Sequence, residues 1–242
     1  MNRKPLTRVT CAIIASTRPW NAGMASRLAR RTGHRIEHIT APGDLTLERL
    51  RALTPRYVFF PHWSHRIPAE IHRRFECVIF HMTDLPFGRG GSPLQNLIAR
   101  RIYETKISAL RCVEGMDAGP VYLKRPLSLF GAAEEIYLRA ASVVEDMVAD
   151  ILARDPRPRP QRGAATVFRR RKPEEGALNA ARSLPSAFDL IRMLDATGYP
   201  PAFIRVGPFR IEFTRASLKT DAVVADARIT LVKSETNDDH DR

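Results

Sequence analysis

Short apolar runs recur along the first two-thirds of this chain, separated by segments of mixed polarity. Residues 9–16 (VTCAIIAS) are almost continuously apolar, as a strand buried on both faces requires. Residues 34–40 instead alternate between apolar and polar positions, which is typical of a half-buried strand. The full set of predicted strands is 9–16, 34–40, 57–60, 77–80, 106–113 and 121–127.

Apolar residues at helical spacing fill the intervals around these strands. We predict helices over residues 26–31, 45–53, 69–75, 94–101 and 132–152. The second is expected to begin at Asp44 as its N-cap, and the third to have Pro68 near its first turn. The last is the longest, and its apolar stripe consists of Ile136, Ala140, Val143, Met147 and Ile151.

Repeated strand–helix–strand units predict an α/β fold, with a Rossmann-like, mostly parallel sheet and helices on both of its faces. Ligands of such sheets bind beyond the carboxyl ends of the strands. Residues 81–93 and 116–120 each follow a predicted strand. Both segments are therefore expected at that edge of the sheet.

The alternation of predicted strands and helices ends after the longest predicted helix. Residues 154–162 (RDPRPRPQR) alternate proline with arginine, which predicts an extended, water-exposed connector. The elements expected after it are a helix at 186–194 with Ser186 as N-cap, and a hairpin of 202–206 with 209–214. The domains we expect are a sheet domain at 1–153, a basic linker at 154–176, and a small C-terminal α+β appendage at 177–242 with a disordered tail at 235–242.

The predicted hairpin has a clear two-sided pattern. Phe209, Ile211 and Phe213 alternate with Arg210 and Glu212, so one face is expected to be buried. This hairpin is also a candidate surface for a homodimer.

The overall composition excludes a membrane-spanning protein and favours a globular one. The chain has 242 residues with 44% hydrophobic content, and no apolar run approaches the roughly 20 residues of a membrane span. Its three cysteines, Cys11, Cys77 and Cys112, are far apart and fall in predicted strands. We interpret them as buried thiols in a cytoplasmic, reducing location.

The formal net charge of +13 allows three interpretations. A nucleic acid is one candidate partner, an anionic small substrate such as a nucleotide or polyglutamated cofactor is another, and an arginine-rich surface without a partner is the third. Few aromatic residues lie among the clustered arginines of 154–172. This does not favour a single-stranded nucleic-acid surface that relies on base stacking.

His81 and Asp117 are the candidate chemical groups. They are 36 residues apart (117 − 81 = 36), and His81 leads directly into a loop rich in glycine and proline, where glycine would let a ligand approach the backbone. An imidazole and a carboxylate in one crevice can move a proton during acyl transfer. The alternatives are a hydrogen-bonded core histidine and an Asx-turn residue.

A longer pattern surrounds both residues. It reads His-x-x-x-x-Pro-x-x-Arg-Gly-x-x-Pro, later followed by Asp-x-Gly, and is filled by His81, Pro86, Arg89, Gly90, Pro93, Asp117 and Gly119. It resembles the 10-formyltetrahydrofolate-dependent formyltransferases, the family of the methionyl-tRNA formyltransferases and the sugar-nucleotide N-formyltransferases. The resemblance runs from about residue 57 to 151 and continues weakly into 169–176 and 199–203.

The resemblance implies formyl transfer from 10-formyltetrahydrofolate, as co-substrate, to a primary amine by a catalytic domain at 1–153. His81 would stabilise the formyl oxygen or shuttle the proton, and Asp117 would orient His81 and help to take the proton of the amine. The co-substrate would lie against residues 60–66 and 112–116. The implied cofactor-binding residues are His62, Trp63, Ser64, Arg89, Gly90, Val113 and Met116.

Three of these positions have other interpretations. Trp63 either stacks on a ring of the ligand or fills the core. His62 and His65 could ligate a metal, but no third ligand has suitable spacing, so we expect no metal. Arg18, at the end of the first strand, is a candidate phosphate contact or part of a structural loop.

The sequence departs from the family pattern at two places. Ile79 stands where the family usually has an asparagine whose amide helps to bind the formyl oxygen. Thr83, Asn96 or a backbone N–H could replace that donor; otherwise the reaction is slow, altered or absent. Asp84 lies where the family tends to be apolar, and could bind a substrate amine or cap the loop.

Three functional hypotheses follow. The first is a cytoplasmic N-formyltransferase acting on a small anionic amine, above all a nucleotide-linked amino sugar, because we expect the chain to be too short for the large C-terminal domain of the tRNA enzyme. The alternative is formylation of aminoacyl-tRNA, favoured by the charge. The third is a non-enzymatic folate- or nucleotide-binding module, favoured by Ile79.

Overall fold

The computed structural model describes residues 10–232, and its central element is a six-stranded sheet of order β2-β1-β3-β4-β6-β7. Strands β2, β1, β3 and β4 are parallel, whereas β6 and β7 are antiparallel to their neighbours. The predicted mostly parallel α/β sheet is therefore confirmed. The six strands are β1 (Cys11–Ala15), β2 (Arg35–Ile39), β3 (Tyr57–Phe60), β4 (Cys77–His81), β6 (Glu104–Arg111) and β7 (Val121–Ser128).

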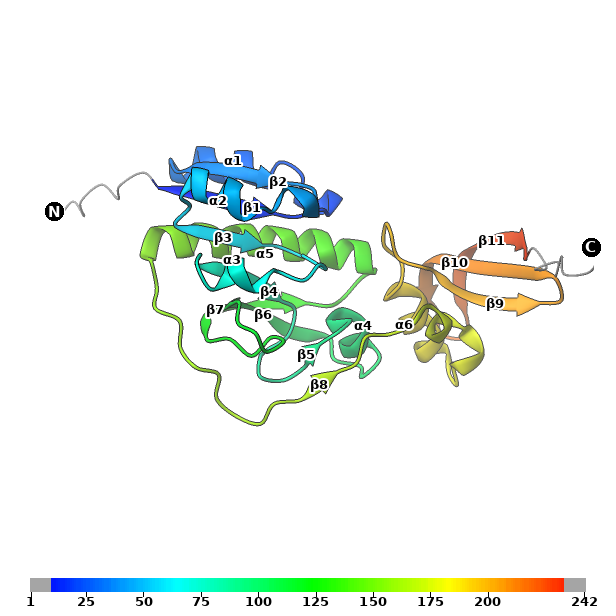
Figure 1. Ribbon diagram of the computed structural model, residues 1–242. Helices are drawn as coiled ribbons and strands as arrows, with labels where there is room; N and C mark the ends of the chain where they lie inside the picture. The colour runs from blue at the N-terminus through cyan, green and yellow to red at the C-terminus, as the bar shows by residue number, and fades with distance from the viewer. Residues whose placement is uncertain (1–9, 233–242) are drawn as a thin grey trace, which may run out of the picture.

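Helices cover both faces of this sheet (Figure 1). They are α1 (Met24–Thr32), α2 (Leu47–Leu53), α3 (Ala69–His72), α4 (Pro93–Ile98) and α5 (Ala133–Arg154), with 3-10 turns η1 (Pro19–Asn21) and η2 (Pro42–Asp44). Within residues 10–232 no helix is long and apolar enough to cross a membrane. The expected N-cap of α2 was wrong: Thr46 caps it by accepting a hydrogen bond from Arg49 N–H, and Asp44 lies in η2.

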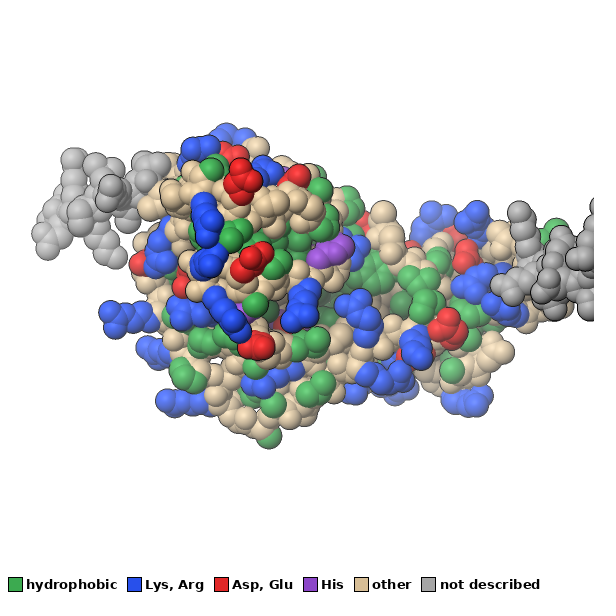
Figure 2. All heavy atoms as spheres, viewed as in Figure 1, with side chains coloured by type: hydrophobic (Ala, Val, Ile, Leu, Met, Phe, Trp, Pro, Cys, Tyr) green, Lys and Arg blue, Asp and Glu red, His purple; other side chains and the backbone are tan. Residues whose placement is uncertain are grey.

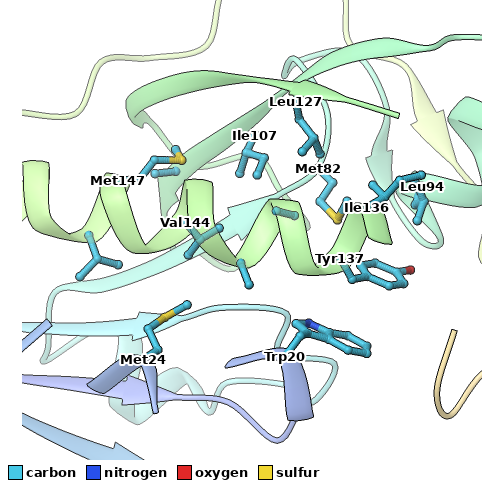
Figure 3. Close-up of a cluster of buried hydrophobic side chains, with 14 of the residues drawn as sticks. Trp20, Met24, Met82, Leu94, Ile107, Leu127, Ile136, Tyr137, Val144 and Met147 are labelled. Atoms are coloured by element: carbon cyan, nitrogen blue, oxygen red, sulfur yellow. The ribbon is translucent and has the colours of Figure 1, made fainter. Parts of the chain in front are cut away.

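Two apolar clusters result from the alternation of side chains along the strands. One lies under α1 and α5, where the buried Ile136, Val144 and Met147 of α5 meet Ile107 and Leu127 of the sheet (Figure 3). The other lies under α2 and α3 on the opposite face. Most of the predicted α5 stripe is fully buried, except for Val143, which is only partly covered.

The C-terminal unit, residues 173–232, lies beyond one end of α5 (Figure 1). It contains η3 (Pro173–Gly176), η4 (Leu178–Ala180), α6 (Leu184–Arg192) and a three-stranded antiparallel sheet of β9 (Ala202–Val206), β10 (Phe209–Leu218) and β11 (Val223–Leu231). The predicted hairpin is present, but β11 was missed. Ser183, not Ser186, is the N-cap of α6, and residues 235–242 lie outside the described range.

The face of the hairpin that was expected to be buried is covered only in part. Phe209 at its outer end is 42% exposed, whereas Ile211 and Phe213 are partly buried. Register explains the difference: Phe209 pairs with Val206 and Leu231 at the free end of the sheet, away from the apolar cluster that Phe213 reaches.

The basic linker is extended, as predicted, but it is attached to the sheet domain rather than free in solvent. Arg159 exchanges two backbone hydrogen bonds of 2.7 and 2.8 Å with Val121. Further on, β8 (Val167–Phe168) pairs in parallel with β5 (Arg89–Gly90). Phe168 is almost fully buried, so apolar burial adds to the backbone pairing that holds the linker in place.

Candidate active site

The structure brings His81 and Asp117 together in a largely buried position. His81 is the last residue of β4, and its Nδ1 lies 3.5 Å from Oδ2 of Asp117; the two side chains are 9% and 13% exposed. The chain reaches Asp117 by a different route from the one expected from the sequence. Because β6 is antiparallel to β4, it ends opposite Val78, near the start of β4. The loop 112–120 must therefore fold back along the sheet to carry Asp117 to His81.

Hydrogen bonds fix the orientation of both groups. His81 Nε2 lies 2.7 Å from the carbonyl oxygen of Gly88, which can only accept, so Nε2 carries a proton and donates. In the neutral imidazole, Nδ1 is then the basic nitrogen, and it faces the carboxylate of Asp117. That carboxylate accepts a 2.8 Å hydrogen bond from the backbone N–H of Gly90.

The glycines after His81 allow another segment of the chain to approach the loop closely. Gly90 has a φ of +104°, and a Cβ built there would lie 2.4 Å from the carbonyl oxygen of Phe168. The close partner is thus β8, and the absence of side chains lets the linker pack onto the loop.

A linker residue that sequence reasoning missed holds the Asp117 loop in place. Gln161 donates from Nε2 to the carbonyl oxygens of Asp117 and Gly119, at 2.7 and 2.8 Å. Its Oε1 accepts from Arg89 Nη2 at 2.8 Å. Arg89 therefore supports the Asp117 loop through Gln161. Nothing in the polar RDPRPRPQR stretch distinguishes Gln161, because its role depends on the return path of the linker.

The side chain at position 79 cannot donate a hydrogen bond. Ile79 lies two residues before His81 on the same face of β4, where it is partly buried against the second apolar cluster. The donors expected to compensate are already in use: Thr83 Oγ1 lies 3.4 Å from Gly88 O, and Asn96 Nδ2 donates to Gly91 O and Arg169 O. A backbone N–H remains as the candidate replacement.

Asp84 is engaged by two lysines. Its carboxylate lies 2.9 Å from Lys106 Nζ and 2.5 Å from Lys124 Nζ. Partial burial raises the pKa of Asp84, but the hydrogen bonds and charges of Lys124 and Lys106 outweigh it and hold that pKa below its ordinary value. The two expected roles, binding a substrate amine or capping the loop, both compete with these ion pairs.

Replacing Asp84 by asparagine is expected to lower the free energy of unfolding at pH 7 by about 0.5–1 kcal/mol, a small effect because water screens this exposed cluster. The folded-state pKa is depressed, so the ion pairs stabilise fully above the unfolded-state pKa of about 3.9. This contribution is lost as the pH falls through the folded-state pKa. Urea unfolding of the wild type and the variant between pH 7 and pH 2 measures it.

The matched control for that series is Asp221→Asn, which removes an exposed carboxylate that has no ion-pair partner in the range 10–232. Its stability should follow the wild type at every pH. A wild-type advantage over Asp84→Asn that stays constant down to pH 2 would contradict the assignment.

The residues expected to bind the folate occupy two different environments. Ser64, Val113 and Met116 are exposed, and Met116 is 73% exposed in the loop that carries Asp117. Trp63 is partly buried, packs edge-on against Phe60, and has a buried Nε1 without a hydrogen-bond partner among residues 10–232. Val113 and Met116 thus leave apolar side chains accessible in the loop that carries Asp117.

His62 is partly buried and is surrounded by aromatic side chains. Its ring packs edge-on against Trp20 and Tyr137. Burial, aided by the nearby charge of Arg18, lowers the pKa of His62 to about 4, so the imidazole is neutral at pH 7. Within the described range, no three His, Cys, Asp or Glu side chains come together in a group that could hold a metal ion.

Comparison with known proteins agrees with this fold. Residues 173–230 match the family model of the methionyl-tRNA formyltransferase C-terminal domain. The solved structure of methionyl-tRNA formyltransferase from Clostridium thermocellum is 47% identical, with a TM-score of 0.90 over 93% of this chain and 100% of that one. The methionyl-tRNA formyltransferase of Gluconobacter oxydans is 31% identical over 54% of this chain and 43% of its own length.

A sheet domain with a buried His–Asp pair and a small antiparallel C-terminal sheet thus defines a formyltransferase fold. The chain belongs to the formyltransferase family that includes the methionyl-tRNA formyltransferases. It spans about half the length of the curated relatives that it matches. A sugar N-formyltransferase-like structure from Mycobacterium tuberculosis shares only the fold, at 16% identity and a TM-score of 0.67 over 94% of this chain and 100% of that one.

Proposed function

We propose that this chain transfers the formyl group of 10-formyltetrahydrofolate to the primary amine of an aminoacyl-tRNA, with methionyl-tRNA as the first candidate. The observation that carries the proposal is the buried contact between His81 and Asp117 beside the exposed Val113–Met116 loop. Membership in the formyltransferase family supports the donor, and the tRNA enzymes among the relatives support the acceptor.

His81 is the proposed proton acceptor. The folate, when bound, supplies the formyl carbon that the amine attacks. His81 Nδ1 is free to take the proton that the amine must lose, because Nε2–H already donates to Gly88 O. Asp117, held by Gly90 N–H, then stabilises the charged imidazolium. Low exposure of both side chains strengthens this interaction, since little water screens it.

The C-terminal unit changes which acceptor is favoured. The preference for an amino sugar assumed that the chain lacks the C-terminal domain of the tRNA enzymes. The match of residues 173–230 to a model of that domain removes this reason. The exposed Arg170, Arg205 and Arg228 have no ion-pair partner within residues 10–232, and Figure 2 shows basic side chains on both units. With a net charge of +13, such a surface favours a polyanion.

The acceptor is tested by measuring kcat/KM for methionyl-tRNA and for a nucleotide-linked amino sugar between 50 and 200 mM NaCl. For the tRNA we expect a fall of about 10²-fold or more, because several bound phosphates release counterions. The amino sugar carries few charges, so its salt dependence should be shallow. A higher kcat/KM for the amino sugar than for the tRNA would assign the enzyme to that second class of acceptor.

A variant of two C-terminal arginines and a control variant in the sheet domain show which unit contributes to the salt dependence. The double variant Arg205→Gln, Arg228→Gln should reduce the salt slope for tRNA by about 1 for each phosphate that an arginine no longer binds. Arg51→Gln removes an exposed arginine of α2 in the sheet domain and should leave the slope unchanged. Equal slopes in all three proteins would exclude a role for the C-terminal arginines.

A further inference from the structure

Arg18 lies just after the carboxyl end of β1, and its guanidinium has no counter-ion among residues 10–232. Within residues 10–232 its side chain forms no ion pair and no hydrogen bond; only its backbone N–H donates, to Ser16 Oγ. The arginines of nearby elements differ, since Arg27 and Arg31 on α1 are paired with Glu145 and Asp146 of α5. The free N–H groups of Arg18 are thus available to a ligand.

Two aromatic rings hold this guanidinium from different parts of the chain. Its Cζ lies 5.7 Å from the ring centre of Trp20 in η1 and 5.8 Å from that of Tyr199, just before β9. Tyr137 of α5 stacks on both rings, and Figure 3 shows it against Trp20. Cation–π contacts of this kind use none of the N–H groups of an arginine as hydrogen-bond donors to a polar atom, so these groups can bind an anion.

Among residues 10–232, no neighbouring group neutralises Arg18. His62 is neutral at pH 7, as its low pKa requires. Two carboxylates hold the adjacent loop but are already engaged by the backbone: Glu134 accepts from Thr197 N–H and Asp195 from Arg215 N–H, both at 2.7 Å. Within residues 10–232, neither carboxylate forms an ion pair with Arg18.

The surroundings of Arg18 contain polar groups that the fold itself leaves unsatisfied. Trp20 Nε1 and Asn21 Oδ1 are buried and have no hydrogen-bond partner within the described range. Gly198, with a φ of +79°, faces the guanidinium: a Cβ there would lie 3.8 Å from Arg18 Nη1. Buried polar groups without partners are uncommon in proteins, and of these two only Trp20 Nε1 is a donor from which an anion could accept a hydrogen bond.

We propose that Arg18 is an anion subsite that binds a phosphate ester of the acceptor while the acceptor amine lies at His81. The inference rests on the proposed function. Strands β1 and β4 are separated only by β3, so their carboxyl ends lie on the order of 10 Å apart. One nucleotide can bridge that distance. The phosphate comes either from the phosphodiester at a tRNA 3′ end or from a nucleoside diphosphate, and Tyr199 makes the C-terminal unit part of the subsite.

Kinetics of Arg18→Gln test this subsite. For methionyl-tRNA or a nucleotide-linked amino sugar, whichever is formylated, KM should rise about 10- to 100-fold, because the variant cannot form a charge-assisted hydrogen bond. The kcat should stay close to that of the wild type. For methionyl-adenosine, which has no phosphate, KM should not change. Arg51→Gln is the control and should match the wild type with every acceptor.

Binding without catalysis separates the subsite from the proposed function. Calorimetric titration with inorganic pyrophosphate, uridine diphosphate and the trinucleotide CCA gives three Kd values each for the wild type, Arg18→Gln and Arg18→Lys. Arg18→Gln should bind at least tenfold more weakly than the wild type, and Arg18→Lys should be intermediate because it keeps the charge but loses the planar fork. Thermal melts establish that each variant is folded.

The outcomes are distinct. If the wild type transfers no formyl group but binds pyrophosphate through Arg18, the proposed function fails and the subsite stands. If transfer occurs while KM and all Kd values are the same in the wild type and Arg18→Gln, the subsite is overturned. If the Arg18→Gln change weakens the Kd of CCA alone, the ligand of Arg18 is a phosphodiester. If it weakens the Kd of uridine diphosphate alone, the ligand is a nucleoside diphosphate.

Discussion

Replacing His81 by alanine is expected to lower kcat for formyl transfer by about 10²–10⁴, the usual contribution of a positioned general acid–base group. The effect should fall on kcat more than on the KM of either substrate, because Nδ1 is proposed to act on the proton lost during the reaction. Single-turnover measurements with saturating formylated folate and acceptor would report the chemical step directly.

The structure sets the controls for that experiment. His81 is nearly buried and donates to Gly88 O, so circular dichroism and a thermal melt must show that the alanine variant is folded. His72→Ala, on α3, changes a histidine outside the site and should keep wild-type turnover. Partial recovery by added imidazole would support a direct role in proton transfer. Wild-type kcat in a folded His81→Ala protein would eliminate the proposed chemistry.

Replacing Ile79 by asparagine is expected to raise kcat by about 10²–10³, the range lost elsewhere when one oxyanion donor is removed. Ile79 lies beside His81 on the same face of β4, and Thr83 and Asn96 already bond to carbonyl oxygens. An amide at position 79 would therefore add a donor where the side chains present supply none.

The comparison with Ile79→Leu isolates the donor from the change in shape. Leucine keeps the position apolar, so its kcat should remain close to that of the wild type. Asparagine should also cost about 1–3 kcal/mol of stability if its amide is left unbonded in the absence of ligand, which a denaturant titration would detect. A folded Ile79→Asn protein that is no faster than the wild type would show that the missing donor does not limit the rate. If neither protein turns over, a binding module becomes the better interpretation.

The local elements of this protein follow from its sequence. The apolar run before Ser16 and the short runs at β3 and β4 form buried strands because their side chains fill both faces of the sheet. The stripe on α5 buries one side of a long helix for the same reason. The spacing of His81, Arg89, Gly90 and Asp117 also indicated the family to which the chain belongs.

The tertiary structure decided where the remaining groups lie, because their partners are distant in the sequence. The antiparallel β6 starts the Asp117 loop at the far end of β4, and only the fold-back of that loop brings the carboxylate to His81. The return of the linker gives Gln161 its role at that loop. Arg18 meets Tyr199 from the opposite end of the chain. The alternation and spacing of apolar residues determine the local helices and strands. These contacts instead depend on how whole elements pack against one another, so no single segment of the sequence determines them.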